Sequence, residues 1–246
     1  MSGRVVEANG VRHYVEEAGT GEPLVLLHGG LGSSETFAAQ LPALAERFHV
    51  VAFDRRGHGR TPDVEGPLSY DAMLDDTVAL LSALRIGRAR IVGFSDGAIL
   101  GLLLAMRRPE LVERLVAIGG NIRPEGMEQW FRTWLERIDA ERYPRKYVEA
   151  YARLTPDGPE HWPTHFAKTK RLWQEEPQVA DEELALIQAP TLVLAGDRDL
   201  VAPEHSLLLY RTIRDAELAI VPGATHDLHE ERPEIVNRLM LDFLTA

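Results

Sequence analysis

Short apolar runs alternate with helix-length segments along most of this chain, and this order limits the fold to a few architectures. Most of the runs contain almost no polar residue, which is typical of strands buried on both faces of a parallel sheet. The segments between them repeat apolar residues every three to four positions, as helices packed on a sheet do. The predicted strands are 5–8, 11–17, 24–27, 50–53, 91–94, 115–118, 192–195 and 218–221, and the predicted helices are 35–47, 70–84, 96–107, 204–214 and 233–244.

The repeated order of strand and helix predicts an α/β fold. We expect a mostly parallel eight-stranded sheet with helices on both faces, joined by right-handed crossovers. The first two runs flank Asn9-Gly10, a dipeptide that favours a tight hairpin, so an antiparallel pair is expected at one edge. Because ligands of such folds bind at the carboxyl ends of the strands, functional residues are expected there.

Residues 121–188 break the alternation. This stretch lacks a convincing strand and contains all four tryptophans of the chain, so we expect a helical insertion, or cap, in a core made of 1–120 and 189–246. Tryptophans four apart, such as Trp130 and Trp134, usually pack in a core. In a lid they would instead form apolar walls of a pocket, so both are candidate substrate-binding residues.

Composition excludes several kinds of partner and chemistry. The formal charge of −11 repels the phosphate backbone that every nucleic-acid-binding protein must neutralise. The absence of cysteine rules out a disulfide and a thiolate nucleophile. The first residues lack the apolar stretch of a signal peptide, and no segment reaches the ~18 apolar residues that span a bilayer. We therefore expect a cytoplasmic protein without nucleic-acid or membrane partners.

A Gly-x-Ser-x-Gly motif joins the predicted strand 91–94 to the predicted helix 96–107. A serine at the tip of such a turn has a strained backbone, and glycines two residues away, here Gly93 and Gly97, let strand and helix approach closely. The hydroxyl is then exposed at the carboxyl edge of the sheet. This context predicts that Ser95 is a nucleophile.

A serine nucleophile needs a histidine base, which a carboxylate in turn orients. Acidic groups follow the predicted strand 192–195, and histidines follow 218–221, in the serine, acid, histidine order of this strand arrangement. Spacing favours Asp199 over Asp197 as the acid, and the position after a glycine turn favours His226 over His229 as the base. The predicted catalytic residues are therefore Ser95, Asp199 and His226.

Acyl transfer also requires amides that stabilise a developing oxyanion. One is predicted to be the amide of Asp96, directly after the nucleophile. The other is expected in the glycine-rich loop after strand 24–27, where Gly30 is the first choice and Leu31 the second. Leu31 is also a candidate substrate contact. The loop 54–60, which looks similar, is interpreted as a structural loop near the site.

A metal site is not indicated. His161 and His165 are four apart, but Pro163 interrupts the helix that would bring them onto one face, and there is no His-Glu-x-x-His motif. We expect no metal ion and no other cofactor.

Together these segments resemble the α/β-hydrolase superfamily of serine hydrolases over the whole chain. The Ser-Asp-Gly at 95–97, followed by His-Asp-Leu-His at 226–229, is similar to the biphenyl hydrolase-like group, which includes valacyclovir hydrolases. The resemblance implies that 121–188 is a helical cap over the active site. It rests on the segments 27–30 (LHGG), 54–59 (DRRGHG), 93–97 (GFSDG), 196–199 (GDRD) and 223–226 (GATH).

The expected reaction is hydrolysis of a small carboxylic ester through an acyl-enzyme on Ser95. The same residues could hydrolyse lactones, carry out perhydrolysis or cleave carbon–carbon bonds, and a related scaffold could instead serve as a small-molecule receptor. With the resemblance, the place of Asp96 beside the nucleophile favours esters whose acyl part carries a positive α-amino group. The alternative is that Asp96 only complements the dipole of the helix that follows.

Overall fold

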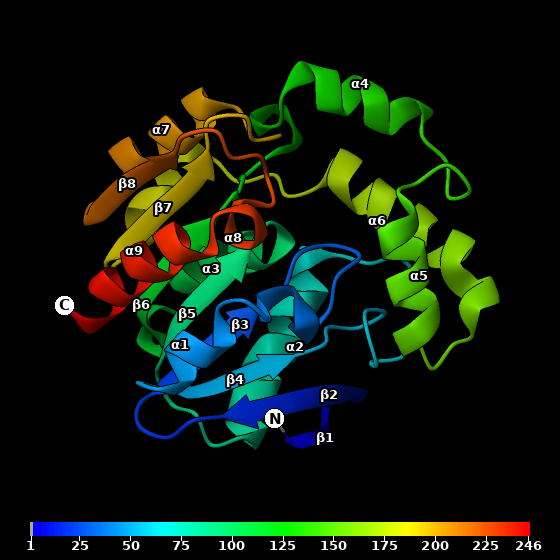
Figure 1. The fold of residues 1–246 in the computed structure, drawn as a ribbon, viewed down its shortest axis with the longest axis horizontal. Helices are drawn as coiled ribbons and strands as arrows, with labels where there is room; N and C mark the ends of the chain where they lie inside the picture. The colour runs from blue at the N-terminus through cyan, green and yellow to red at the C-terminus, as the bar shows by residue number, and fades with distance from the viewer. Residues whose placement is uncertain (1) are drawn as a thin grey trace.

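A computed structural model of the chain describes residues 2–246 and contains one eight-stranded sheet in the order β1-β2-β4-β3-β5-β6-β7-β8 (Figure 1). All strands from β3 onward run parallel, whereas β2 lies antiparallel to both β1 and β4. The predicted α/β architecture is thereby confirmed. The strands are β1 (Ser2–Ala8), β2 (Val11–Ala18), β3 (Pro23–Leu27), β4 (His49–Phe53), β5 (Ala89–Phe94), β6 (Val112–Ile118), β7 (Thr191–Gly196) and β8 (Ala216–Val221).

The edge hairpin forms as the sequence predicted. Asn9 and Gly10 connect β1 to β2 with φ of 50° and 74°, the left-handed conformation that a tight hairpin turn needs.

The central strands are buried on both faces: in β3, Leu24 packs in one core cluster and its neighbour Val25 in the other. This double burial explains why the runs show no polar alternation.

Helices cover both faces of the sheet. On one face, side chains such as Leu80, Leu100 and Leu209 pack with Val25, and on the other Leu44 and Met240 pack with Leu24. The helices of the first face are α2 (Tyr70–Ala83), α3 (Asp96–Arg107) and α7 (Pro203–Thr212); those of the second are α1 (Leu41–Ala45), α8 (Leu228–Glu231) and α9 (Pro233–Thr245).

The predicted helix 35–47 does not exist as one helix. The chain forms a 3-10 turn, η1 (Ser34–Phe37), and then the short α1. Pro42 occupies the first turn of α1, where its missing N–H is harmless, but a helix continuing through it from residue 35 would lose a hydrogen bond. The buried Gln40 between the two pieces donates from Nε2 to the carbonyl oxygen of His229, at 2.7 Å.

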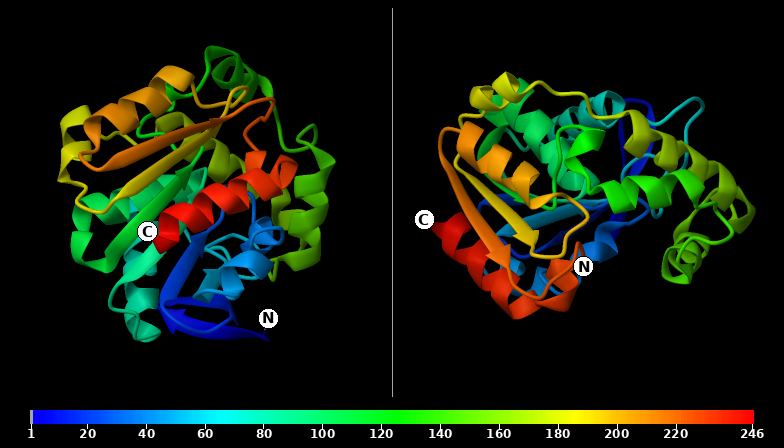
Figure 2. Two further views of the ribbon diagram at one scale, coloured as in Figure 1. Left: turned by 60° about the vertical axis from the view of Figure 1, so that its left-hand side comes forward. Right: turned by 90° about the horizontal axis from the view of Figure 1, so that it is seen from above.

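Residues between β6 and β7 form an all-helical insertion that projects from one side of the sheet (Figure 2). Its helices enclose an apolar cluster of their own, which includes Tyr143, Trp162 and Phe166. The last part of the insertion does not pack with this cluster, because Val179 and Leu184 pack in the main core beside the sheet. The elements are η3 (Pro124–Gly126), α4 (Gln129–Arg137), α5 (Arg145–Leu154), η4 (Pro159–His161), α6 (Trp162–Glu175) and η5 (Asp181–Leu186), with the remaining short turn η2 (Pro109–Leu111) between α3 and β6.

No helix within residues 2–246 is both long enough and apolar enough to cross a lipid bilayer.

Candidate active site

The carboxyl ends of five neighbouring strands meet at one edge of the sheet. The last residue of β3, Leu27, pairs with Gly93 of β5, and Ile118 at the end of β6 pairs with Phe94. The ends of β7 and β8 pair in the same way, Gly196 with Val221. The loops that carry the predicted functional residues therefore emerge side by side, as expected for this sheet.

Ser95 forms a sharp turn between β5 and α3. Its φ of 52° and ψ of −117° lie outside the ordinary regions for a residue with a side chain. The glycines on either side are required by close approach: a Cβ on Gly93 would lie 2.2 Å from the carbonyl oxygen of Gly97, and one on Gly97 would lie 1.8 Å from that of Leu27. The strained turn places Ser95 in the wall of a cavity.

His226 lies in the same cavity wall, and its Nδ1 is 2.6 Å from Oδ1 of Asp199. Of the two acidic candidates, only Asp199 contacts the histidine; Asp197 accepts a hydrogen bond from the amide of Ala224, at 3.2 Å, in the turn. His229 is fully buried and packs against Phe94, with the ring centres 4.2 Å apart. The geometry thus brings together Ser95, His226 and Asp199.

The pairing changes the proton affinity of both partners. Burial alone would lower the pKa of His226, but the charge of Asp199 and the hydrogen bond to it reverse this, and the net pKa is raised. For Asp199, burial is likewise opposed by His226 and by backbone donors, and the net pKa is lowered. A histidine whose Nδ1 is held by a carboxylate presents Nε2 as the proton acceptor. His229 is different, because burial lowers its pKa to about 4.

Gly119, directly after β6, supports this pair and was missed by the sequence analysis. It has φ of 59°, and a Cβ there would lie 2.8 Å from Cε1 and 2.9 Å from Nδ1 of His226. The same atom would lie 3.3 Å from Oδ2 of Asp199. The signal in the sequence was the Gly119-Gly120 pair at the end of a buried strand.

The residues predicted to supply the oxyanion amides line the same cavity as Ser95. Asp96 is the first residue of α3, so its amide has no acceptor within the helix. Gly30 and Leu31 both line the cavity that contains Ser95. Leu31 has φ of 57°, which is unusual for a residue with a side chain, and it packs with the aromatic cluster of the insertion.

The side chain of Asp96 is buried in a polar network. Its Oδ1 accepts hydrogen bonds from the hydroxyl of Tyr70, at 3.0 Å, and from Nε1 of Trp173, at 2.8 Å. Its Oδ2 has no hydrogen-bond partner and lies 4.0 Å from Nη2 of the buried Arg55. Burial, partly opposed by Arg55 and the two hydrogen bonds, raises the pKa of Asp96.

The cavity lies between the sheet edge and the insertion and has a volume of about 270 Å³. Ser95, His226 and Gly30 lie on its core side, whereas the insertion supplies a largely aromatic wall. The charged groups around it are Glu35, Asp96, Lys146, Asp227 and Glu230. The apolar and aromatic residues that the insertion contributes are Met127, Phe131, Tyr143, Tyr147, Ala150, Tyr151, Leu154 and Trp173.

Trp130 and Trp134, expected as substrate contacts, do not line this cavity. Trp130 is 59% exposed on the outside of α4, and both tryptophans border a separate surface groove. Trp134 also packs inside the insertion, against Phe131 and Tyr143. The inward face of α4 carries Phe131 instead, so the prediction chose the wrong face of an aromatic helix.

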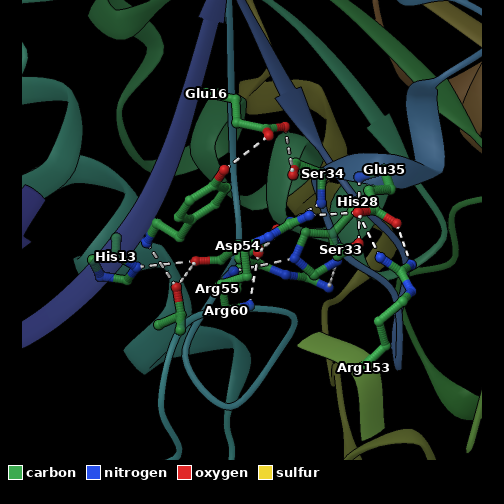
Figure 3. Close-up of polar contacts among 12 residues, drawn as sticks. His13, Glu16, His28, Ser33, Ser34, Glu35, Asp54, Arg55, Arg60 and Arg153 are labelled. Carbon is green, nitrogen blue, oxygen red and sulfur yellow. Dashed lines mark hydrogen bonds and ion pairs between the residues drawn. The ribbon is translucent and has the colours of Figure 1, made fainter. Parts of the chain in front are cut away.

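The loop 54–60 has the structural role expected for it. Asp54, which is fully buried, accepts hydrogen bonds from the amides of Ser34 (2.6 Å) and Arg60 (2.8 Å). Figure 3 shows the network continuing from Arg60 to Glu35, which also binds Arg153 of α5. A second ion pair, Lys146 with Asp227 at 2.8 Å, also connects α5 to the core.

Within residues 2–246 no cluster of side chains has the composition of a metal site. His161 precedes α6 and bonds to Asp63, at 2.8 Å, whereas His165 lies inside the helix against Tyr151. The two histidines therefore do not act as a pair.

Residues 24–239 match the sequence profile of the alpha/beta hydrolase family, and the chain belongs to that family. Mouse (Mus musculus) serine hydrolase BPHL is 32% identical over 250 residues, covering 97% of this chain and 85% of the relative. A protein of Caulobacter sp. (strain K31), provisionally named carbamate hydrolase RutD, is 33% identical and covers 90% of each chain. The enol-lactonase of Burkholderia xenovorans LB400 superposes with a TM-score of 0.80 at 25% identity, covering 99% of this chain and all of the other.

Proposed function

We propose that this chain is a serine esterase that cleaves small carboxylic esters through an acyl-enzyme on Ser95. One observation carries the proposal: a serine in a strained strand-to-helix turn shares a cavity with a histidine whose other ring nitrogen is held by a buried carboxylate. Nothing in ordinary packing requires that combination, whereas acyl transfer does.

The proposed reaction begins when Oγ of Ser95 attacks the ester carbonyl and Nε2 of His226 takes its proton. Asp199 stabilises the resulting imidazolium, in line with the raised pKa of His226. The amides of Gly30 and Asp96 stabilise the oxyanion of the tetrahedral intermediate. His226 then returns the proton to the departing alcohol, and a water molecule releases the acid by the same steps.

The cavity suggests the size and character of the substrate. A volume of about 270 Å³ holds a small molecule, and the aromatic wall from the insertion favours an apolar group near the reacting carbonyl. Asp96, Asp227 and Glu230 make the charged lining more acidic than basic. This balance favours a neutral or cationic ester over an anionic one.

Within esters, we propose a preference for those with an α-amino group on the acyl part. Oδ2 of Asp96 has no hydrogen-bond donor and is buried beneath Gly30, and the residue borders the cavity directly after the nucleophile, so an ammonium reaches this oxygen only if the Gly30 loop moves. Arg55, at 4.0 Å from Oδ2, balances part of that charge, so the gain from an ammonium is that of one further charged hydrogen bond. Such a bond contributes roughly 1.5 to 3 kcal/mol.

A labelling experiment tests the chemistry. A fluorophosphonate probe should label the wild-type protein and the matched control Ser82→Ala, an exposed serine on α2, but not Ser95→Ala. A kinetic screen over esters that vary in acyl size and charge should then find turnover. Labelling without turnover of any ester, lactone or carbamate would favour a small-molecule receptor over an enzyme.

Asp96→Asn tests the amino-acyl preference. We expect kcat/KM for α-amino esters to fall by about ten- to a hundredfold, the equivalent of one charged hydrogen bond. Esters of the same size without the amine should change little. Equal losses on both would show that Asp96 supports the nucleophile turn rather than recognising the substrate.

Lactone hydrolysis, perhydrolysis and carbon–carbon bond cleavage remain open to the same three residues. The same kinetic screen, extended to lactones and to carbon–carbon substrates, ranks these reactions by kcat/KM. A lactone turned over at least tenfold faster than every open-chain ester would replace the ester assignment while leaving the roles of the three residues unchanged.

A further inference from the structure

Arg55 is a buried cation that the proposed reaction does not use. It follows β4 in the loop 54–60, is 1% exposed, and lies behind the glycine-rich loop that follows β3. Its Nη2 donates a hydrogen bond to the carbonyl oxygen of Gly29, at 3.0 Å, whereas Nε and Nη1 have no partner. Burying a charge whose donors are not all paired lowers the free energy of unfolding, so the interior position of Arg55 requires a specific reason.

The carbonyl oxygen of Gly29 also accepts a hydrogen bond from a second side chain, that of His28. The amide of Arg55 donates to Nε2 of His28, at 3.1 Å, so the ring proton of a neutral His28 lies on Nδ1. That Nδ1 is 2.7 Å from the oxygen of Gly29 and donates to it. The amide of Gly32 also points at this oxygen, at 3.3 Å. Figure 3 shows Arg55 beside His28.

Three donors on one carbonyl fix the orientation of a peptide plane. In a trans peptide the C=O of Gly29 and the N–H of Gly30 point in opposite directions. The carbonyl is held on the Arg55 side, so the amide of Gly30 faces away from Arg55. Within residues 2–246 this amide donates to no group of the chain, and Gly30 lines the cavity with Ser95.

Arg55 also adjoins the residue that supplies the second amide. Its Nη2 is 4.0 Å from Oδ2 of Asp96. Gly30 packs directly on that carboxylate, since a Cβ on Gly30 would lie 2.6 Å from Oδ2 and 2.5 Å from Cζ2 of Trp173. One guanidinium therefore contacts the peptide group that contains the Gly30 amide and the side chain of Asp96, whose own amide begins α3.

We propose that Arg55 is a positioning residue for the oxyanion hole. It holds the Gly29 carbonyl so that the Gly30 amide faces the cavity, and its charge keeps the Asp96 side chain beside the loop. A cation bonded to a peptide carbonyl also strengthens the N–H of that peptide as a donor. The proposal rests on the proposed function, because only acyl transfer at Ser95 develops the oxyanion.

Kinetics on an ester without an amine, such as p-nitrophenyl butyrate, test the proposal without involving amine recognition. Arg55→Met keeps much of the side-chain volume but removes the charge and the hydrogen bond. Losing one donor of an oxyanion hole costs about 10²- to 10³-fold in kcat. We expect at least a hundredfold loss of kcat with KM changed less than about threefold. Arg55→Lys, which retains the charge without the planar fork, should recover part of this loss.

Arg56→Met is the matched control. Arg56 is also largely buried, and it pairs with Asp76 at 2.5 and 2.6 Å, away from the cavity. Its loss should lower the melting temperature but leave kcat within about threefold. The rate at which fluorophosphonate modifies Ser95 provides a second measure of the oxyanion hole, and it should fall in Arg55→Met in parallel with kcat.

The outcomes separate this proposal from the proposed function. If the wild-type protein is labelled but cleaves no ester, the esterase assignment fails, and the labelling rates of the variants still decide the role of Arg55. A folded Arg55→Met with wild-type kcat and labelling rate, or with a change in KM alone, would overturn the role. If Arg55→Met does not fold, a folded Arg55→Lys decides: a tenfold loss of kcat at constant KM supports the role, and wild-type kcat refutes it. A wild-type protein that is neither labelled nor active would remove both proposals.

Discussion

Gly119→Ala is the most direct test of the proposed catalytic base, because it perturbs His226 without changing any proposed catalytic residue. The added methyl group would lie 2.8 Å from Cε1 and 2.9 Å from Nδ1 of the ring. The backbone at Gly119 has φ of 59°, so alanine there is also strained.

The expected loss follows from these distances. An ordinary contact begins near 3.4 Å, so the ring of His226 must move back by roughly 0.6 Å. A displacement of about 1 Å at a catalytic group can cost about a hundredfold in rate, and we therefore expect kcat to fall about ten- to a hundredfold. The backbone strain should in addition cost about 1 to 2 kcal/mol of folding free energy.

Gly10→Ala separates the two effects. Gly10 has φ of 74° in the edge hairpin, and a Cβ there meets nothing within 4 Å. It should lose a comparable amount of stability in thermal unfolding while keeping wild-type kcat on the best ester of the screen. If Gly119→Ala also kept kcat within twofold, His226 in this position would not be the base that limits turnover.

Three further outcomes are expected. Because the base must be neutral and the pKa of His226 is raised above its usual value, kcat/KM should be lost as the pH falls through that raised pKa; a flat profile from pH 5 to 8 would contradict this. Asp199→Asn should lower kcat by about 10³- to 10⁴-fold and shift the acidic limb of the kcat/KM profile to lower pH, whereas Asp197→Asn should do neither. If Asp197→Asn had these effects and Asp199→Asn did not, the roles of the two residues would be exchanged. Trp130→Ala should leave KM within twofold and Phe131→Ala should raise it several-fold, and equal effects would contradict the assignment of the pocket wall.

Strands were predictable because burial on both faces leaves a strong signature. The run at 24–27 shows this: adjacent residues pack in opposite core clusters, so none of them can be polar. The helix at 35–47 was wrong because apolar spacing continued across a break that only Pro42 marked. Local spacing describes which side of a helix is apolar, but it does not show where the chain stops being helical.

The insertion was harder, since α4 is aromatic on more than one side. Phe131 and Leu135 are one helical turn apart and buried, and Trp130 and Trp134 form an equally apolar neighbouring pair. Of these four side chains Phe131 faces the cavity, and that choice depends on the packing of α4 against Trp173 and Tyr143, residues distant in sequence. Periodicity contains no information about that choice.

At the site, motifs placed the residues of the proposed chemistry but not those that support them. Ser95, His226 and Asp199 each follow a recognisable strand, so their meeting at one edge could be predicted. Gly119 and Arg55 act through close contacts with groups far away in the sequence, and such contacts appear only in three dimensions.

The way the insertion joins the core bears on how this chain could be rebuilt. The amide of Val179 donates to the carbonyl of Ile122, at 3.0 Å, so the two ends of the excursion 123–178 are adjacent. Beyond that junction the chain packs in the core through Leu184 and Ile187. Segments whose ends lie together tolerate replacement and changes of length. A chimera that exchanges 123–178 for the corresponding segment of another family member should therefore fold and change substrate selectivity. A chimera in which the exchanged segment extends to residue 188 would instead lose Leu184 and Ile187 from the core.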